Sequence, residues 1–416
     1  MKTISIDIES FSDINLAKCG VYKYAESPAF EILLFGYAVD GGEVQVIDLA
    51  QGETIPEEIL DALTDESVTK WAFNASFERV CLSRYLRDLG RSIDPFHDHH
   101  SLSTETAQFL NPAGWKCSMI WSAYMGLPLS LEGVGAVLKL GSQKMKEGKD
   151  LIRYFCTPAK ARDGSPIRHY PTDALEKWSL FKAYNLRDVE TEMSIQQKLS
   201  KFPVTESEWR NYTLDQQIND RGIMLDRTLV TQAIRCDERF KRTHMEQARS
   251  VTGLDNPNSP VQLKAWLADM DMPMESLARK IVQEKAAQAD GIVAELLNLR
   301  LELSKTSVKK YEAMARCVCR DGRVHGLLQF YGANRTGRWA GRLVQAQNLP
   351  QNHLPDLDLA REIVKTGDEE LLDTLFASVP GTLSELIRTA FIPKDGCRFL
   401  VADFSAIEAR VLAWLA

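Results

Sequence analysis

Short runs of alternating hydrophobic and polar residues dominate the first two hundred positions, and this pattern is typical of β-strands. The predicted strands are TISIDIES, EILLFGYAV, EVQVIDL and WAFNAS, at residues 3–10, 31–39, 43–49 and 71–76. Mixed helical stretches follow, and a segment rich in glycine and proline leads to a long predicted helix that starts near Thr172. We therefore expect residues 1–200 to form an α/β domain.

Beyond Pro203 the pattern changes to a helical one with few strand signals. Long helical stretches are predicted at residues 206–220, 230–250 and 284–315. The leucines between Leu296 and Leu303 do not repeat over the three or four heptads that a coiled coil needs, so we expect them to pack in a buried helix interface. Residues 201–320 are thus expected to form an all-α domain.

A third segment, residues 321–416, contains the sequence CRFLVADF, which is predicted to be an apolar strand that runs into Asp403. A helix is predicted to start at Ser405. The last residues are apolar and carry no C-capping glycine or basic last turn. From this ending we expect a chain that stops inside a domain.

The composition is that of an ordinary globular protein, with 44% hydrophobic and 26% charged residues in a chain of 416. This length is enough for two or three domains. No apolar run approaches the roughly 18 residues of a membrane span, and the N-terminus has no apolar signal-peptide core, so a cytoplasmic protein is expected. The eight cysteines are scattered without a CxxC pair, which argues against zinc and thioredoxin-like chemistry and favours reduced thiols.

The net charge of −7 argues against nucleic-acid binding until the charges are mapped along the chain. Residues 301–350 contain nine Lys or Arg against three Asp or Glu, whereas residues 351–380 contain two against seven. Charge segregated in this way permits a basic groove on an acidic protein.

Candidate metal ligands begin in the first predicted strand. Alternate side chains of a strand face the same way, so Asp7 and Glu9 share one face, opposite the core face of the neighbouring isoleucines. Two carboxylates about 7 Å apart on one strand face can converge on a divalent cation. Taken alone, this pair is better explained by a solvated strand face.

Two further pairs lie four residues apart in predicted helices, which places each pair on one helix face. They are Asn74 with Glu78 and Tyr184 with Asp188. Each alone matches an ordinary helix surface, but together with the strand they supply four carboxylates and a phenol. Oxygen-only ligands suit Mg²⁺ or Mn²⁺ rather than zinc, and two such ions can clamp a phosphodiester. The HDHH sequence at residues 97–100 is more simply explained as a solvated loop.

This ordered set resembles the DEDD family of 3′→5′ exonucleases, in the subgroup whose third motif is Tyr-x-x-x-Asp. The resemblance implies a ribonuclease H-like mixed sheet flanked by helices, with two Mg²⁺ (or Mn²⁺) ions. The implied metal ligands are Asp7, Glu9, Glu78 and Asp188. It also implies that Tyr184 orients the attacking water and that Asn74 contacts DNA. The family usually has Asp where this sequence has Glu78, which moves the charge by one methylene.

Residues 331–351 are polar, basic and interrupted by glycines that let a backbone approach a ligand closely. Their arginines can meet phosphates or base edges, although a flexible basic loop would have the same composition. The stretch resembles the TGR…QNLP segment of family A DNA polymerases (bacterial DNA polymerase I type). By this resemblance Arg338 reads the minor groove near the primer terminus, and the other implied DNA contacts are Arg335, Thr336, Gln347 and Asn348.

The sequence LVADFSAIEARVL resembles the palm motif of the same family, usually written DYSQIELR. The resemblance implies that Asp403 is a polymerase metal ligand, that Glu408 excludes a ribose 2′-hydroxyl and that Arg410 is a supporting cation. Ser405-x-x-Glu408 also reads as a capping box for the predicted helix. RGIMLD and NSPVQLKAWL look like the thumb, and residues 114–141 are most similar to phage and prophage members.

We therefore expect a family A DNA polymerase truncated in the palm. Its expected parts are a 3′→5′ exonuclease domain (1–200), a helical thumb (201–320) and the N-terminal part of an α+β palm (321–416), without the fingers and the second palm carboxylate. The expected activity is proofreading hydrolysis without polymerisation, by a monomer in the cytoplasm of a bacterial or phage-infected cell. The expected partners are a single-stranded DNA 3′ end and primer–template duplex, with dNTP bound only by the intact parent.

Two alternatives remain open from the sequence. A stand-alone exonuclease acting on DNA or RNA would use the thumb as a substrate clamp, and a preference for RNA would favour it. A non-catalytic module would grip primer–template through the thumb and the basic stretch at 301–350. Duplex binding with a steep salt dependence and without hydrolysis would favour that alternative.

Overall fold

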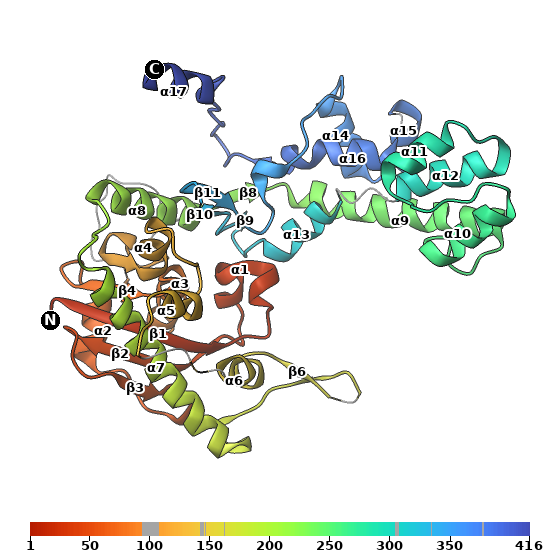
Figure 1. Ribbon diagram of the computed structural model, residues 1–416. Helices are drawn as coiled ribbons and strands as arrows, with labels where there is room; N and C mark the ends of the chain where they lie inside the picture. The colour runs from red at the N-terminus through yellow and green to blue at the C-terminus, as the bar shows by residue number, and fades with distance from the viewer. Residues whose placement is uncertain are drawn as a thin grey trace.

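The computed structural model describes residues 1–93, 108–141, 145, 147–161, 163–303, 308–333, 335–376 and 378–416. The chain begins with an α/β unit that is built around one sheet (Figure 1). A helical arm extends from this unit along one long helix, and the chain then returns toward the unit through a second mixed region.

The N-terminal sheet has five strands in the order β3-β2-β1-β4-β5. Its strands are β1 (Thr3–Phe11), β2 (Glu31–Val39), β3 (Gln45–Asp48), β4 (Thr69–Ala72) and β5 (Trp115–Cys117). The pairs β1–β2 and β2–β3 are antiparallel, whereas β1–β4 and β4–β5 are parallel. The predicted mixed sheet flanked by helices is therefore confirmed, with β1 at its centre.

Seven helices surround this sheet in the described part of the unit. They are α1 (Leu16–Ala25), α2 (Glu57–Thr64), α3 (Ser76–Asp88), α4 (Ser118–Tyr124), α5 (Leu131–Val137), α6 (Gly148–Phe155) and α7 (Leu175–Leu199). A short hairpin of β6 (Ala159–Lys160) and β7 (Pro166–Ile167) follows α6. The predicted long helix is α7, which starts at Leu175 after a 3₁₀ turn and packs against β1 and β2.

Both faces of β1 are covered. Ile4, Ile6 and Ile8 are buried in the main core of the unit, as the alternation predicts. Ser5 and Glu9, on the opposite face, are also buried, each 8% exposed, because α7 covers that face. A solvated strand face, the simplest explanation of the Asp7–Glu9 pair, is therefore excluded.

Gly36 lets α7 lie close to the sheet. It faces Asp7 across the β1–β2 ladder, and a Cβ atom placed on it would lie 2.5 Å from Asn185 Oδ1 of α7. Real Cβ contacts are not this short, so either the helix or the amide would have to move. The absence of one methyl group at this position therefore sets the distance between α7 and the sheet.

Residues 206–317 are mostly helical, as the sequence predicts. Helix α8 (Glu206–Arg221) packs on the N-terminal unit (Figure 1). The helices that follow are α9 (Arg227–Thr252), α10 (Pro260–Asp269), α11 (Arg279–Ala286), α12 (Gly291–Leu303) and α13 (Lys309–Cys317). The continuous helix expected at residues 284–315 is wrong, because the chain leaves the helix after Ala286 and turns at Gly291, whose φ is +57°. Leu296, Leu297 and Leu299 are buried, which confirms packing in a core rather than a coiled coil.

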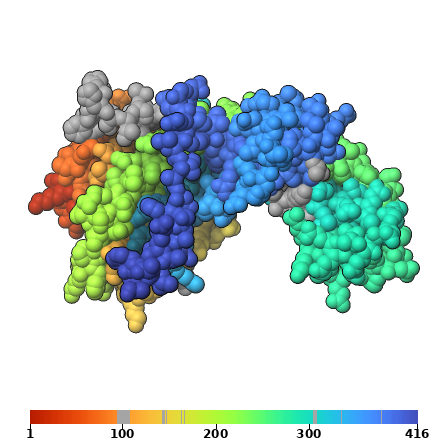
Figure 2. Space-filling model, turned by 90° about the horizontal axis from the view of Figure 1, so that it is seen from above, coloured from red at the N-terminus to blue at the C-terminus, as the bar shows by residue number. Residues whose placement is uncertain are grey.

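The tip of the arm, residues 248–301, has a hydrophobic core of its own. Trp266, Leu263 and Leu267 of α10 pack there with Val282 of α11 and the buried leucines of α12. Figure 2 shows this tip, in teal, projecting from the rest of the molecule. The start of α9 belongs to a different core, which it shares with residues 308–390.

The region after α13 combines small sheets with helices. Its strands are β9 (Arg323–Val324), β10 (Leu328–Ala333), β11 (Arg338–Gly341) and β12 (Phe391–Ile392). They are joined by β8 (Ile223–Leu225), which lies earlier in the chain, before α9. β8 pairs with both β9 and β12, and β10 pairs with β11 in a hairpin. The helices are α14 (Leu357–Thr366), α15 (Glu369–Leu375), α16 (Val379–Leu386) and α17 (Ile407–Leu415).

Two predictions near the C-terminus are wrong. Residues 397–404, all of them described, form no strand, and Val401 is 91% exposed without a strand to pair with. The final helix starts at Ile407 rather than Ser405, and its N-cap is Ala406 with φ +52° and no side-chain cap. Because the backbone turns at Ala406, the expected Ser405–Glu408 capping box does not form.

Among the helices that the structure describes, none combines the length and the apolar character that crossing a bilayer requires.

We predict that Gly36→Ala lowers the free energy of unfolding by about 1–3 kcal/mol, the usual cost of overpacking a close contact. Urea denaturation measures this change. The matched control is Gly141→Ala, where an added Cβ meets nothing within 4 Å, and this change should be neutral or slightly stabilising. Equal stability of the two variants would show that α7 does not depend on Gly36 for its approach to the sheet.

Candidate functional site

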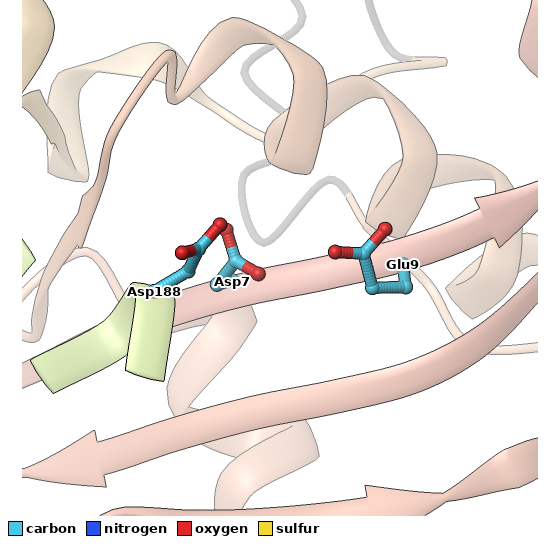
Figure 3. A group of neighbouring side chains, drawn as sticks. All are labelled: Asp7, Glu9 and Asp188. Atoms are coloured by element: carbon cyan, nitrogen blue, oxygen red, sulfur yellow. The ribbon is translucent and has the colours of Figure 1, made fainter. Parts of the chain in front are cut away.

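Three carboxylates meet where α7 crosses β1. Asp7 and Glu9 from β1 and Asp188 from α7 each place one oxygen so that all three lie within 4.8 Å of one another (Figure 3). Glu9 and Asp188 are buried, at 8% and 4% exposure, and Asp7 is partly exposed. The structure thus brings together three of the four carboxylates that the sequence singled out.

Local backbone geometry explains this convergence. The two-residue period of β1 turns Asp7 and Glu9 to the same side. Between Glu9 and Ser10 the register against β2 shifts by one residue, and an irregularity of this kind increases the local twist of the strands beside the site. Asn185 Nδ2 donates hydrogen bonds to the Asp7 carboxylate at 2.8 Å and to the Asp7 backbone carbonyl at 3.1 Å, which attaches α7 directly to β1.

Asn185 and Cys156 are site residues that the sequence analysis missed. The Cys156 thiol at the end of α6 donates to Glu9 Oε2 at 3.7 Å. For Asn185 a signal existed, because it lies three residues before Asp188 and so on the same helix face. For Cys156 no spacing rule connects a residue after α6 with a strand 147 positions earlier.

Tyr184 is fully enclosed beside Asp188. Its ring is 1% exposed and stacks on Phe181, and Gly148 of α6 lies so close that a Cβ there would overlap the ring. Its hydroxyl donates a hydrogen bond to Asp188. Burial, followed by the charges of Glu9 and Asp188, raises the pKa of Tyr184 far above its usual range, so the hydroxyl stays a donor.

Glu78 lies in the first turn of α3, near the three carboxylates but outside their group. It is 3% exposed, and within the described part of the chain its Oε2 atom has no hydrogen-bond partner. Burial, and then the charges of Asp7 and Glu9, raise its pKa well above the usual value. Glu78 is thus a buried carboxyl that lies close enough to the group for its charges to raise the Glu78 pKa.

Asn74 differs from expectation. Helix α3 begins at Ser76, and Asn74 precedes it with φ +78°, so the prediction that Asn74 and Glu78 share a helix face is wrong. Asn74 instead lines a cavity of about 280 Å³ between α3, α4, α8 and β10. Asp215 of α8 and Arg342 after β11 line the same cavity.

A further buried carboxylate, Glu192, lies one turn beyond Asp188 on α7 and is 2% exposed. It accepts hydrogen bonds from Gln196 at 2.7 Å and from the hydroxyls of Ser5 and Ser118. Burial raises the pKa of Glu192 from 4.5 to about 7. Glu192 was not predicted from the sequence, although its position four residues after Asp188 places it on the same helix face.

The predicted DNA contacts after residue 330 lie at the surface. Arg335 and Thr336 are in the exposed turn between β10 and β11, and Arg338 starts β11. Gln347 and Asn348 are in a 3₁₀ turn. The Gln347 side chain packs so closely on Gly341 of β11 that a Cβ atom on this glycine would overlap it.

The palm-motif residues are exposed as well. Glu408 on α17 forms an ion pair of 3.3 Å with Arg338, and Arg410 Nε donates to the Ser405 carbonyl at 2.9 Å. Asp403 precedes α17 in the extended segment, and it belongs to no group of three or more candidate metal ligands among the residues that the structure describes. The HDHH sequence at residues 97–100 lies outside the described residues.

We predict that Glu192 makes stability depend on pH. The folded protein holds the Glu192 proton more tightly than the unfolded chain does. The protonated carboxyl therefore contributes fully to the free energy of unfolding below pH 4.5, and this contribution is lost as pH rises through about 7. Glu192→Gln cannot ionise. The unfolding free energy of this variant, relative to wild type, should therefore rise by on the order of 3 kcal/mol between pH 4 and pH 8.

Urea denaturation in EDTA across this pH range measures the effect. Glu190→Gln is the matched control, because Glu190 lies on the same helix with its side chain 38% exposed and should give a difference that changes little with pH. Parallel curves for Glu192→Gln and wild type would contradict the prediction.

Comparison with known proteins finds similarity to DNA polymerases. Residues 227–416 match the family model for DNA polymerase family A. The chain is 51% identical over 420 residues to the DNA polymerase of Bacillus phage SP02, and the match covers all of this chain and 62% of the relative. The chain therefore spans about three fifths of the length of the curated relative it matches.

A solved structure has a related fold. The POL domain of Pol1 from M. smegmatis, in complex with DNA primer-template and dNTP, superposes with a TM-score of 0.51 at 18% identity, over 99% of this chain and 58% of that chain. At this identity the similarity concerns the fold alone. The family match concerns residues 227–416, less than half of the chain, and relates this part of the chain to DNA polymerase family A.

Proposed function

We propose that the N-terminal unit is a two-metal 3′→5′ exonuclease that removes nucleotides from DNA ends in a family A DNA polymerase. The observation that carries this proposal is the convergence of Asp7, Glu9 and Asp188 within 4.8 Å. A separation too large for the three carboxylates to share a cation would have ruled it out.

The donor set fits Mg²⁺ or Mn²⁺. All its atoms are carboxylate oxygens, which these hard cations prefer, and no cysteine or histidine belongs to the described group. Asp7, Glu9 and Asp188 would hold the ions, and the unpartnered Glu78 Oε2 is a further oxygen that faces them. When bound, such ions stabilise the charge that develops as a phosphodiester is hydrolysed.

The residues of the chain have distinct roles in this proposal. Tyr184 keeps its proton and donates a hydrogen bond to Asp188, which leaves the hydroxyl oxygen as an acceptor that is suited to orient a water molecule beside Asp188. Asn185 fixes the rotamer of Asp7 from α7. The burial of Glu9 and Asp188 keeps bulk water away from the reacting groups and strengthens each electrostatic interaction.

DNA is the partner that we infer. The β10–β11 turn presents Arg335 and Arg338 at the surface, within a stretch that has a local excess of basic residues. The M. smegmatis domain of similar fold was solved with DNA primer-template. We extend that class of partner to this chain, in which the same region would grip the duplex near the end that the exonuclease shortens.

The two alternatives differ from this proposal in their assays. A non-catalytic binding module has no need for three converging acidic groups in a mostly buried position, since like charges there cost stability. A stand-alone exonuclease would act on a free strand, and a direct comparison of RNA and DNA as substrates distinguishes it.

We predict that Asp7→Asn lowers the rate of hydrolysis of a 5′-labelled DNA with a recessed 3′ end by at least about 100-fold in Mg²⁺. Loss of a residue that hydrogen-bonds to a metal ligand lowers activity by about 10- to 100-fold, and loss of the ligand itself should lower it at least as much. Stepwise shortening on a denaturing gel measures the rate, and EDTA should abolish it in wild type.

Glu176→Gln is the control, because Glu176 is exposed in the first turn of α7, and it should hydrolyse at the wild-type rate. Thermal unfolding shows whether both variants are folded. Shortening by Asp7→Asn at the wild-type rate, or none by wild type in either Mg²⁺ or Mn²⁺, would refute the proposal and favour the binding module.

We also predict that this 416-residue chain does not extend primers. Polymerisation needs carboxylates gathered around the metals of the palm, and Asp403 is exposed and joins no ligand group in the part of the chain that the structure describes. Incubation of the labelled primer–template with all four dNTPs tests this. Extension by a single nucleotide would contradict it.

A further inference from the structure

A buried ion pair joins α3 to α8. Both terminal nitrogens of Arg79 bind the Asp220 carboxylate, at 2.7 and 2.9 Å, and neither side chain is more than 4% exposed. Arg79 Nη1 also donates to the Leu110 carbonyl at 2.8 Å. A two-point contact of this kind fixes orientation as well as distance.

Aromatic and imidazole groups extend this joint toward the polymerase-family region. The Tyr22 hydroxyl donates to Asp220 at 2.7 Å, and the Tyr22 ring stacks on His325 at a centroid distance of 5.2 Å. His325 Nδ1 lies 2.9 Å from the Asp220 carbonyl, and its Nε2 lies 2.9 Å from Asp321. The joint therefore holds α1, α3, the end of α8 and the segment around β9 together.

Arg79 directly follows Glu78 in the first turn of α3. Successive side chains on a helix point about 100° apart, so one residue can reach α8 while the other faces β1. Helix α3 packs against β1, and Glu78 is 3% exposed with its Oε2 atom buried and unpaired among the described residues, close enough to Asp7 and Glu9 for their charges to raise its pKa. Any rotation of α3 about its axis would displace Glu78 from the three carboxylates.

We propose that Arg79, through its two-point contact with Asp220, is a positioning residue that sets the orientation of Glu78 toward the metal site. This inference rests on the proposed exonuclease function. It makes the placement of α8, six residues before the polymerase-family segment at 227, a determinant of metal affinity in the N-terminal unit.

The test replaces Arg79 by Lys, which keeps the charge but not the two-point geometry. The matched control is Arg84→Lys, because Arg84 is on the same helix and also pairs with one carboxylate, that of Asp88, through its Nε atom, while its Nη1 atom donates to backbone carbonyls of Ala25 and Glu26. Tyr22→Phe is a milder second variant, since it removes one hydrogen bond to Asp220 and keeps the ring.

Two readouts are needed. The first is the Mg²⁺ concentration at half-maximal hydrolysis, and the second is Mn²⁺ binding followed by electron paramagnetic resonance of the free ion, which needs no turnover. Arg79→Lys should weaken one of two Mn²⁺ sites and raise the Mg²⁺ requirement by about 10- to 100-fold, as loss of a supporting contact does. Tyr22→Phe should have a smaller effect in the same direction, and Arg84→Lys should match wild type.

The outcomes separate the two claims. Wild type that neither hydrolyses DNA nor binds Mn²⁺ refutes the exonuclease proposal and this inference with it. An active wild type whose Arg79→Lys and Tyr22→Phe variants bind metal like Arg84→Lys refutes the positioning role alone. The positioning role is also refuted if the variants lose activity only in proportion to the fraction of each variant that is unfolded, as measured by thermal unfolding.

Discussion

Repulsion among carboxylates is the constraint on which the N-terminal unit depends. Asp7, Glu9 and Asp188 would separate in water, yet a strand and a helix far apart in the sequence hold them within 4.8 Å. The surrounding packing must therefore supply the force that keeps them together. Gly36, which admits α7 to the sheet, and Asn185, which binds Asp7, are the parts of the structure that do so most directly.

The same constraint explains why uncharged donors gather around the group. Tyr184 donates to Asp188, Cys156 to Glu9 and Asn185 to Asp7, so each carboxylate accepts at least one hydrogen bond from a neutral side chain. Neutral donors hold the acids in place without neutralising them. A permanent positive charge among them would compete with a cation, and the buried Arg79 of α3 is instead paired with Asp220 of α8.

The sequence predicted the local parts of this arrangement better than the long-range ones. Strand alternation found Asp7 and Glu9, and helical spacing linked Tyr184 with Asp188, because both depend only on neighbours within one element. Asn185 lies on the same helix face, three residues before Asp188, but its contact with Asp7 depends on the long-range packing of α7 on β1. The strand expected before Asp403 failed since a strand needs a partner, and hydrophobicity alone cannot show that one is present.

Boundaries were missed for a related reason. The pattern at residues 284–315 is helical throughout, but a turn at Gly291 lets α12 fold back onto α9. Asn74 was assigned to α3, and its left-handed backbone instead directs it into the cavity beside α8. In both cases a single backbone conformation, which hydrophobic periodicity does not encode, decides where the element begins.

The separate core at the tip of the arm has a consequence for how the protein responds to heat. Residues 248–301 bury their own leucines and Trp266, and they join the rest of the molecule through α9 and the chain after α12. A region with its own core can open as a cooperative unit without disturbing its neighbours. Calorimetry of this protein would then record two overlapping transitions, and one melting temperature would describe neither of them.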